Sequence, residues 1–137
     1  MKLALRLGTS EVKTTAQTLA AKLRGGEVIA LIGQLGSGKT AFTQALAKAI
    51  GVRQKVLSPT FIVWQEFPTK LKTKTGQIVK LAHLDLYRTQ NFTEVAVLGI
   101  GQTWRQPHTI TIIEWADKIK PQLPPGTIYI YLHRDVS

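Results

Sequence analysis

Cysteine is absent from the 137-residue chain, so the sequence provides neither disulfides nor thiolate-bound metal. No hydrophobic run approaches the roughly 18 residues that a membrane-spanning helix requires. The N-terminal stretch Met-Lys-Leu-Ala-Leu-Arg is interrupted by charge too early for a signal peptide. We therefore expect a single domain over residues 1–137, without a membrane segment, working in the reducing cytoplasm.

Acidic residues are also scarce. Basic residues outnumber them by 18 to 8, which gives a formal net charge of +10. A positive field of this kind favours polyanionic partners, RNA first among them. The same charge could instead serve solubility and attract a nucleotide, and composition leaves both interpretations open.

The most specific motif is Gly-Gln-Leu-Gly-Ser-Gly-Lys-Thr at residues 33–40, which matches the phosphate-binding pattern G-x-x-x-x-G-K-[ST]. An unbroken apolar run at 28–32 predicts a buried strand before it, and apolar residues at helical spacing over 40–50 predict a helix after it. Glycines let backbone N–H groups face an anion, and the helix start adds its positive dipole end. We expect a nucleoside triphosphate here, with Lys39 at the terminal phosphates and the Thr40 hydroxyl on magnesium.

The chain before the motif predicts a strand and a helix. Alternating leucines indicate a half-buried strand over 2–7. Ser10 is expected to be the N-cap of the following helix, with Glu11 in its first turn, and Gly25-Gly26 to end it. An apolar stripe identifies its buried face: Val12, Ala16, Leu19, Ala20 and Leu23.

Beyond the motif, aromatic and β-branched residues predict a strand at 61–67 that returns at 78–84 as an antiparallel hairpin. Its tip is expected to carry Lys70, Lys72 and Lys74, either as a solvated loop or as a finger for nucleic acid.

The remaining segments complete the predicted fold. A short helix is expected over 93–98, and strands over 109–113 and 128–132. The fold class is α/β: a P-loop NTPase-like three-layer fold whose mixed sheet, a parallel core plus an antiparallel hairpin, is flanked by helices.

Two carboxylates follow predicted strands, where ligands of open α/β sheets gather. Glu114 has the pattern of a magnesium-associated acid, and Asp85 could orient water. A strand-end charge or an ion pair is the alternative for both, and spacing favours it less for Glu114 than for Asp85. His83 is interpreted as a packed or hydrogen-bonded side chain. Arg88 could neutralise phosphate or pair with Asp85, and Trp115 could belong to the core or stack on a base.

Four stretches in this order resemble the TsaE family: the motif at 33–40, Ser-Pro-Thr-Phe at 58–61, His-Leu-Asp-Leu-Tyr-Arg at 83–88 and Ile-Glu-Trp at 113–115. The likeness extends over about 28–117. This family comprises small bacterial ATPases required for threonylcarbamoyladenosine modification of tRNA.

The resemblance implies ATP and Mg²⁺ as cofactors, slow hydrolysis, and action within a complex that drives or resets its TsaD-like and TsaB-like partners. Direct contact with tRNA through the basic surface is a further expectation. When the family's site residues are carried over to the matching positions, the resemblance implies a catalytic set of Lys39, Asp85 and Glu114. It also implies that Thr40 and Glu114 hold the metal. The nucleotide-binding set is Gly33, Leu35, Gly36, Ser37, Gly38, Lys39, Thr40, Thr60 and Trp115.

The sequence departs from the family at Gln34, where the family typically has aspartate. Two other classes of function remain as alternatives: a small P-loop kinase, and a non-enzymatic RNA-binding or scaffolding protein that uses ATP as a structural ligand. A kinase would need an acceptor pocket and an arginine-bearing lid, for which the chain offers few arginines.

Overall fold

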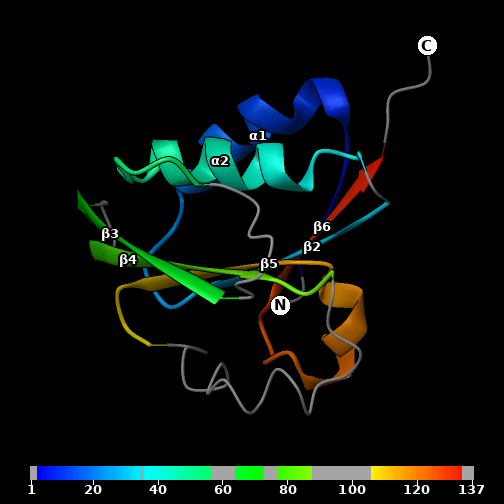
Figure 1. Cartoon of the computed structure of the whole chain (residues 1–137). Helices are drawn as coiled ribbons and strands as arrows, with labels where there is room; N and C mark the ends of the chain where they lie inside the picture. Colours follow the sequence, from blue (N-terminus) through cyan, green and yellow to red (C-terminus); the bar gives the residue numbers. More distant parts are fainter. Residues whose placement is uncertain (1–2, 35, 57–63, 73–76, 88–105, 134–137) are drawn as a thin grey trace.

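The computed structural model describes residues 3–34, 36–56, 64–72, 77–87 and 106–133. Figure 1 shows one sheet with two helices on one side of it and a shorter helical segment on the other. Five expectations from the sequence lie outside the described residues: the helix at 93–98, Leu35, Thr60, Lys74 and Arg88.

The sheet has six strands in the order β1-β6-β2-β5-β4-β3. All neighbours pair in parallel except β3 and β4, which form the predicted antiparallel hairpin. The strands are β1 (Leu3–Gly8), β2 (Val28–Gly33), β3 (Trp64–Lys72), β4 (Gln77–Asp85), β5 (Thr109–Glu114) and β6 (Ile128–His133). This confirms the predicted mixed sheet.

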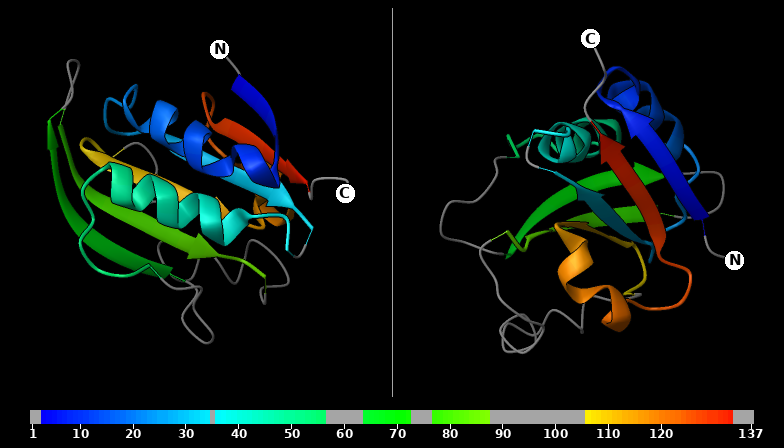
Figure 2. Two further views of the ribbon diagram at one scale, coloured as in Figure 1. Left: turned by 90° about the horizontal axis from the view of Figure 1, so that it is seen from above. Right: turned by 90° about the vertical axis from the view of Figure 1, so that its right-hand side faces the viewer.

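Helices α1 (Val12–Ala20) and α2 (Lys39–Ala49) pack side by side on one face of the sheet, as the view from above shows (Figure 2). The 3-10 segment η3 (Ala116–Gln122) lies on the opposite face (Figure 1). Two apolar clusters fill the two interfaces, one around Phe42 beneath the helices and one around Ile119 beneath η3. The three-layer fold is thereby confirmed.

The central strands are buried because both faces of the sheet are covered. Every residue of β5 is buried, as are the first four of β2. The apolar stripe predicted from the sequence is buried: Val12, Ala16, Leu19 and Ala20 in α1, and Leu23 in the segment that follows the helix.

The predicted N-cap of α1 is wrong. The chain enters the helix through a 3-10 turn, η1 (Thr9–Glu11), so Ser10 lies inside that turn and the N-cap position is Glu11. The Glu11 carboxylate instead accepts a hydrogen bond from the Gly8 N–H at 3.1 Å. The helix also ends at Ala20, before the predicted glycine pair, and those glycines form the turn into β2.

The predicted hairpin tip is also partly wrong, because Lys70 and Lys72 lie within β3. Pro68 falls between the two hairpin strands predicted at 61–67 and 78–84. It lies instead in an edge strand, where a missing N–H is tolerated, and the register shifts between Pro68 and Leu71. The strand is joined to the end of α2 by a hydrogen bond from the Thr69 hydroxyl to the Ile50 carbonyl.

In the described parts of the chain, no helix is long and apolar enough to cross a membrane.

Candidate nucleotide site

The glycine loop joins the carboxyl end of β2 to the first turn of α2. Gly36 and Gly38 have φ angles of 78° and 107°, in the left-handed region that glycine adopts without strain. Gly38 is the N-cap of α2, and no side chain caps the helix there. A helix start binds anions through its free backbone N–H groups and the positive end of the helix dipole. This end of α2 is therefore suited to phosphate.

Gly33 lies where β2 turns into the loop, and its lack of a side chain is required. An added Cβ would lie 2.5 Å from Ser37 Oγ and 2.6 Å from the Leu132 carbonyl oxygen. The close approach keeps the loop folded against β6. Ser37, at 1% exposure, is buried in this contact.

Lys39 folds back over the loop that precedes it. Its Nζ donates to the Gly33 and Gln34 carbonyl oxygens, each at 2.7 Å. The ammonium also lies 3.9 Å from the centre of the Trp115 ring. Burial lowers the pKa of Lys39, and the negative charges of acidic neighbours, Glu114 first, partly oppose that shift. The ammonium is therefore a desolvated donor beside the loop, where a phosphate could exchange with the two carbonyls.

Glu114 ends β5 and connects the sheet to α2. Its carboxylate accepts hydrogen bonds from Thr40 Oγ1 at 3.0 Å and Thr43 Oγ1 at 3.5 Å. His83 Nε2 lies 2.6 Å from Glu114 Oε2, and both side chains are buried, at 0% and 2% exposure. The carboxylate is thus fixed by three partners from β4 and α2.

Asp85 lies beside Glu114, because the two residues are paired in the register of β4 and β5. Its Oδ1 accepts a hydrogen bond from the Tyr87 N–H at 3.0 Å. Trp115 has a left-handed backbone, with φ of 61°, and turns the chain from β5 into η3. Its ring lies 5.0 Å from that of Tyr87, centre to centre. Glu114, Asp85 and Trp115 therefore lie near the Lys39 ammonium, and Tyr87 packs on Trp115.

Magnesium prefers oxygen ligands and usually keeps waters and phosphate oxygens in its shell. The Thr40 hydroxyl and Glu114 carboxylate provide two such oxygens at the helix start. Among the described residues, no group of three or more histidines, aspartates and glutamates could hold a metal by itself. The residues fit a cation shared with a phosphate rather than one enclosed by protein ligands alone.

Two residues of this network, Thr43 and His83, were not among the site residues predicted from the sequence. Thr43 follows Thr40 by three positions, so both hydroxyls lie on one face of α2. His83 precedes Asp85 by two positions, which places both on one face of β4. The interpretation of His83 as a hydrogen-bonded side chain is confirmed, and its partner is the predicted magnesium ligand Glu114.

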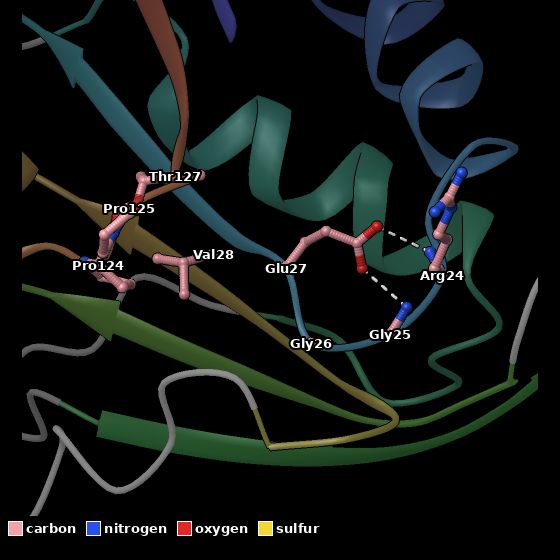
Figure 3. A pocket seen from close by; sticks show the side chains of 9 residues that line it. Arg24, Gly25, Gly26, Glu27, Val28, Pro124, Pro125 and Thr127 are labelled. Atoms are coloured by element: carbon pink, nitrogen blue, oxygen red, sulfur yellow. Dashed lines mark hydrogen bonds between the residues drawn. The ribbon is translucent and has the colours of Figure 1, made fainter. Parts of the chain in front are cut away.

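A separate cleft of about 370 Å³ lies at the opposite end of the sheet, at the start of β2 and β6 (Figure 3). The Glu27 carboxylate beside it accepts hydrogen bonds from the backbone N–H groups of Arg24 and Gly25, at 2.8 and 2.7 Å. Those bonds stabilise the turn. The cleft shares no lining residue with the glycine loop and is not part of the nucleotide site.

The strand, glycine loop and helix, with an acid on the adjacent parallel strand, define a P-loop α/β protein. Comparison with known proteins gives the family. Residues 8–137 match the family model described as threonylcarbamoyl adenosine biosynthesis protein TsaE. The chain belongs to the TsaE family.

Two relatives carry the name tRNA threonylcarbamoyladenosine biosynthesis protein TsaE. The protein from Bacillus subtilis is 33% identical over 90% of this chain and 72% of its own length. The protein from Aquifex aeolicus is 41% identical over 77% of this chain and 70% of its own length. The crystal structure of Bacillus subtilis YdiB has a similar fold, with a TM-score of 0.66 and 27% identity over 96% of this chain and 74% of that one.

Proposed function

We propose that this protein binds and slowly hydrolyses ATP with Mg²⁺ as a subunit of the machinery for threonylcarbamoyladenosine synthesis on tRNA. The names of its relatives support the pathway. The observation that supports the chemistry best is the hydrogen bond between Thr40 and Glu114 beside the glycine loop. Because the machinery uses ATP and tRNA, we propose that this protein works in the cytoplasm.

The loop would bind the phosphates through the N–H groups at the start of α2. Lys39 would exchange its bonds to the Gly33 and Gln34 carbonyls for bonds to phosphate oxygens, a charge-assisted and therefore stronger pairing. The cost of burying its charge would then be offset by a charge of opposite sign.

Thr40 and Glu114 would hold the metal, with His83 and Thr43 fixing the carboxylate. A bound Mg²⁺ would neutralise charge that develops on the phosphate oxygens during transfer to water. Asp85 pairs with Glu114 in the sheet and would orient the attacking water and accept its proton. Trp115 would border the nucleotide.

The phosphoryl acceptor would be water, and the free energy of hydrolysis would be coupled to TsaD-like and TsaB-like partners. The protein would not transfer the threonylcarbamoyl group itself. Its ATPase cycle would drive or reset the partner complex. We therefore expect slow ATP turnover by the isolated protein.

Phosphate release by purified protein tests the assignment. Lys39→Ala and Glu114→Gln should each lower the rate of ATP hydrolysis at least about 100-fold, because Lys39 would stabilise the charge of the transferred phosphoryl group directly and Glu114 would do so by holding the Mg²⁺. Lys48→Ala is the matched control, since Lys48 is an exposed lysine of the same helix. Rates equal to the parent's in both site variants would exclude the proposed chemistry.

The partners can be tested separately. Addition of the TsaD-like and TsaB-like proteins of the same cell should change the rate of ATP turnover. A rate that instead rises only with a small-molecule acceptor would identify a kinase. A protein that binds ATP without any turnover, alone or with partners, would be a scaffold.

A further inference from the structure

A cluster of cations and tyrosines lies on the sheet face opposite α1 and α2. It consists of Arg6 on β1, Tyr129 and Tyr131 on β6, and Lys120 in η3. The Arg6 guanidinium lies 5.0 Å from the centre of the Tyr131 ring. Lys120 Nζ lies 5.3 Å from the Tyr129 ring centre and 5.5 Å from that of Tyr131.

Strand register explains why these side chains meet. Arg6 pairs with Tyr131 across β1 and β6, so both side chains lie on the same face of the sheet. Lys120 reaches the same face from η3 and donates a hydrogen bond to the Tyr131 hydroxyl at 2.9 Å. This bond raises the pKa of Lys120, so the side chain is charged at neutral pH.

No acidic side chain of the described residues neutralises the charge of the cluster. Within the described residues, neither Arg6 nor Lys120 forms an ion pair with a carboxylate. Arg6 is exposed, and Lys120 and Tyr131 are partly exposed. Two ordered cations beside an accessible ring, on a chain of net charge +10, are complementary to a polyanion that also has flat, stackable groups.

We propose that the Arg6–Tyr131–Lys120 cluster binds unpaired nucleotides of RNA. A base stacks on the Arg6 and Tyr131 pair, and the Lys120 ammonium pairs with a flanking phosphate. Bases of single-stranded RNA stack on tyrosine rings and guanidinium planes, whereas a base inside a duplex presents no free face. The choice of RNA over other polyanions rests on the proposed function in tRNA modification.

The cluster is close to the glycine loop but separate from it. Tyr131 pairs with Ile32, the residue that precedes Gly33 of the loop, on the neighbouring strand. Bound RNA would therefore lie beside β2, the strand that leads into the glycine loop. It would lie on the sheet face opposite α1 and α2. Arg6, Tyr131 and Lys120 take no part in the hydrogen bonds that Lys39 and Thr40 form in the nucleotide site.

Fluorescence anisotropy with a labelled RNA hairpin that has an unpaired loop tests the proposal. Arg6→Gln/Lys120→Gln should weaken binding roughly tenfold or more and lower the slope of log affinity against log salt by about 0.7, the value for the one phosphate contact on a single strand that is lost with Lys120. Lys13→Gln/Lys48→Gln is the control, because both lysines are exposed on the helical layer and the loss of charge is the same. Equal losses of RNA affinity in the two double variants would show that net charge alone determines binding, and would overturn the proposal.

The ring is tested separately. Tyr131→Leu should weaken binding about fivefold or more, because it removes the stacking surface, and Tyr131→Phe should stay within about twofold of the parent. The parent should also bind the hairpin more tightly than a continuous duplex of equal length. Equal affinity for the duplex, or an unchanged affinity in Tyr131→Leu, would contradict base stacking and leave an acidic protein surface as the better partner.

ATP hydrolysis without RNA should be unchanged in Arg6→Gln/Lys120→Gln. A failure of the RNA-binding proposal is therefore distinguishable from a failure of the proposed ATPase activity.

Discussion

Thr40 donates a hydrogen bond to Glu114 over 3.0 Å, although 74 positions separate the two residues in the sequence. Thr40 lies in the first turn of α2, directly after the glycine loop. Glu114 ends β5, which pairs in parallel with β2 so that Leu31 lies opposite Glu114. The pairing of these strands therefore brings the two proposed magnesium ligands together at one edge of the sheet.

Asp85→Asn should lower ATP turnover about 100-fold or more while ATP affinity stays within about twofold, because only the proton-accepting step is removed. Asparagine keeps the oxygen that accepts the Tyr87 N–H, so the strand end should retain its conformation. Single-turnover hydrolysis and calorimetric titration with ATP measure the two quantities. An unchanged turnover rate would exclude Asp85 from the mechanism.

His83→Leu should weaken the dependence of turnover on Mg²⁺, with the apparent affinity for the metal reduced roughly tenfold, because an orienting partner of the ligand Glu114 is lost. His83→Gln, whose amide nitrogen can donate to the same carboxylate, should recover part of that affinity. Mn²⁺ binding followed by electron paramagnetic resonance gives a second measurement that does not depend on turnover. Identical metal affinity in the parent and both variants would show that His83 serves packing alone.

ATP affinity should fall as the pH is raised above neutrality toward 10.5, the ordinary pKa of lysine, because burial lowers the pKa of Lys39. The free protein thus loses the ammonium proton at a lower pH than an exposed lysine would. Phosphate favours the protonated form, so binding takes up a proton wherever Lys39 is neutral. Calorimetric titration with ATP over a pH series measures both the affinity and the proton uptake. In Lys39→Arg the decline should be absent, since guanidinium stays charged, and an equal decline in both proteins would contradict the assignment to Lys39.

Gly33→Ala should lower the free energy of unfolding by about 1–3 kcal/mol, because the added methyl group overpacks the contact with Ser37 and Leu132. Urea denaturation provides the measurement. Gly33→Ala/Ser37→Gly removes the clash with Oγ but leaves the backbone carbonyl of Leu132 at 2.6 Å, so the double variant should remain less stable than Ser37→Gly. Equal stability of those two proteins would show that the loop relaxes at no cost.

The sequence predicted the parallel core well because its signals are local. The apolar run before Gly33 and the helical spacing after Lys39 correspond to β2 and α2 within one residue at each end. The hairpin strands were also predicted in the correct pairing. Pro68 misled the placement of the tip, since proline is typical of turns but is also compatible with an edge strand.

The candidate site was predictable only as separate parts. Motif and strand-end position pointed to Lys39, Thr40 and Glu114, but no local pattern shows that His83 and Thr43 meet Glu114. Those contacts depend on which strands become neighbours and on the register between them. The same holds for the pairing of Arg6 with Tyr131, which joins the first and last strands of the chain.

A crystal structure with Mg²⁺ and a non-hydrolysable ATP analogue tests the central claim most directly. We predict the phosphates on the N–H groups at the start of α2, Lys39 Nζ withdrawn from the Gly33 and Gln34 carbonyls onto a phosphate oxygen, and the metal beside Thr40 and Glu114. A ligand bound away from the glycine loop, with Lys39 still on the two carbonyls and Glu114 distant from the metal, would contradict it.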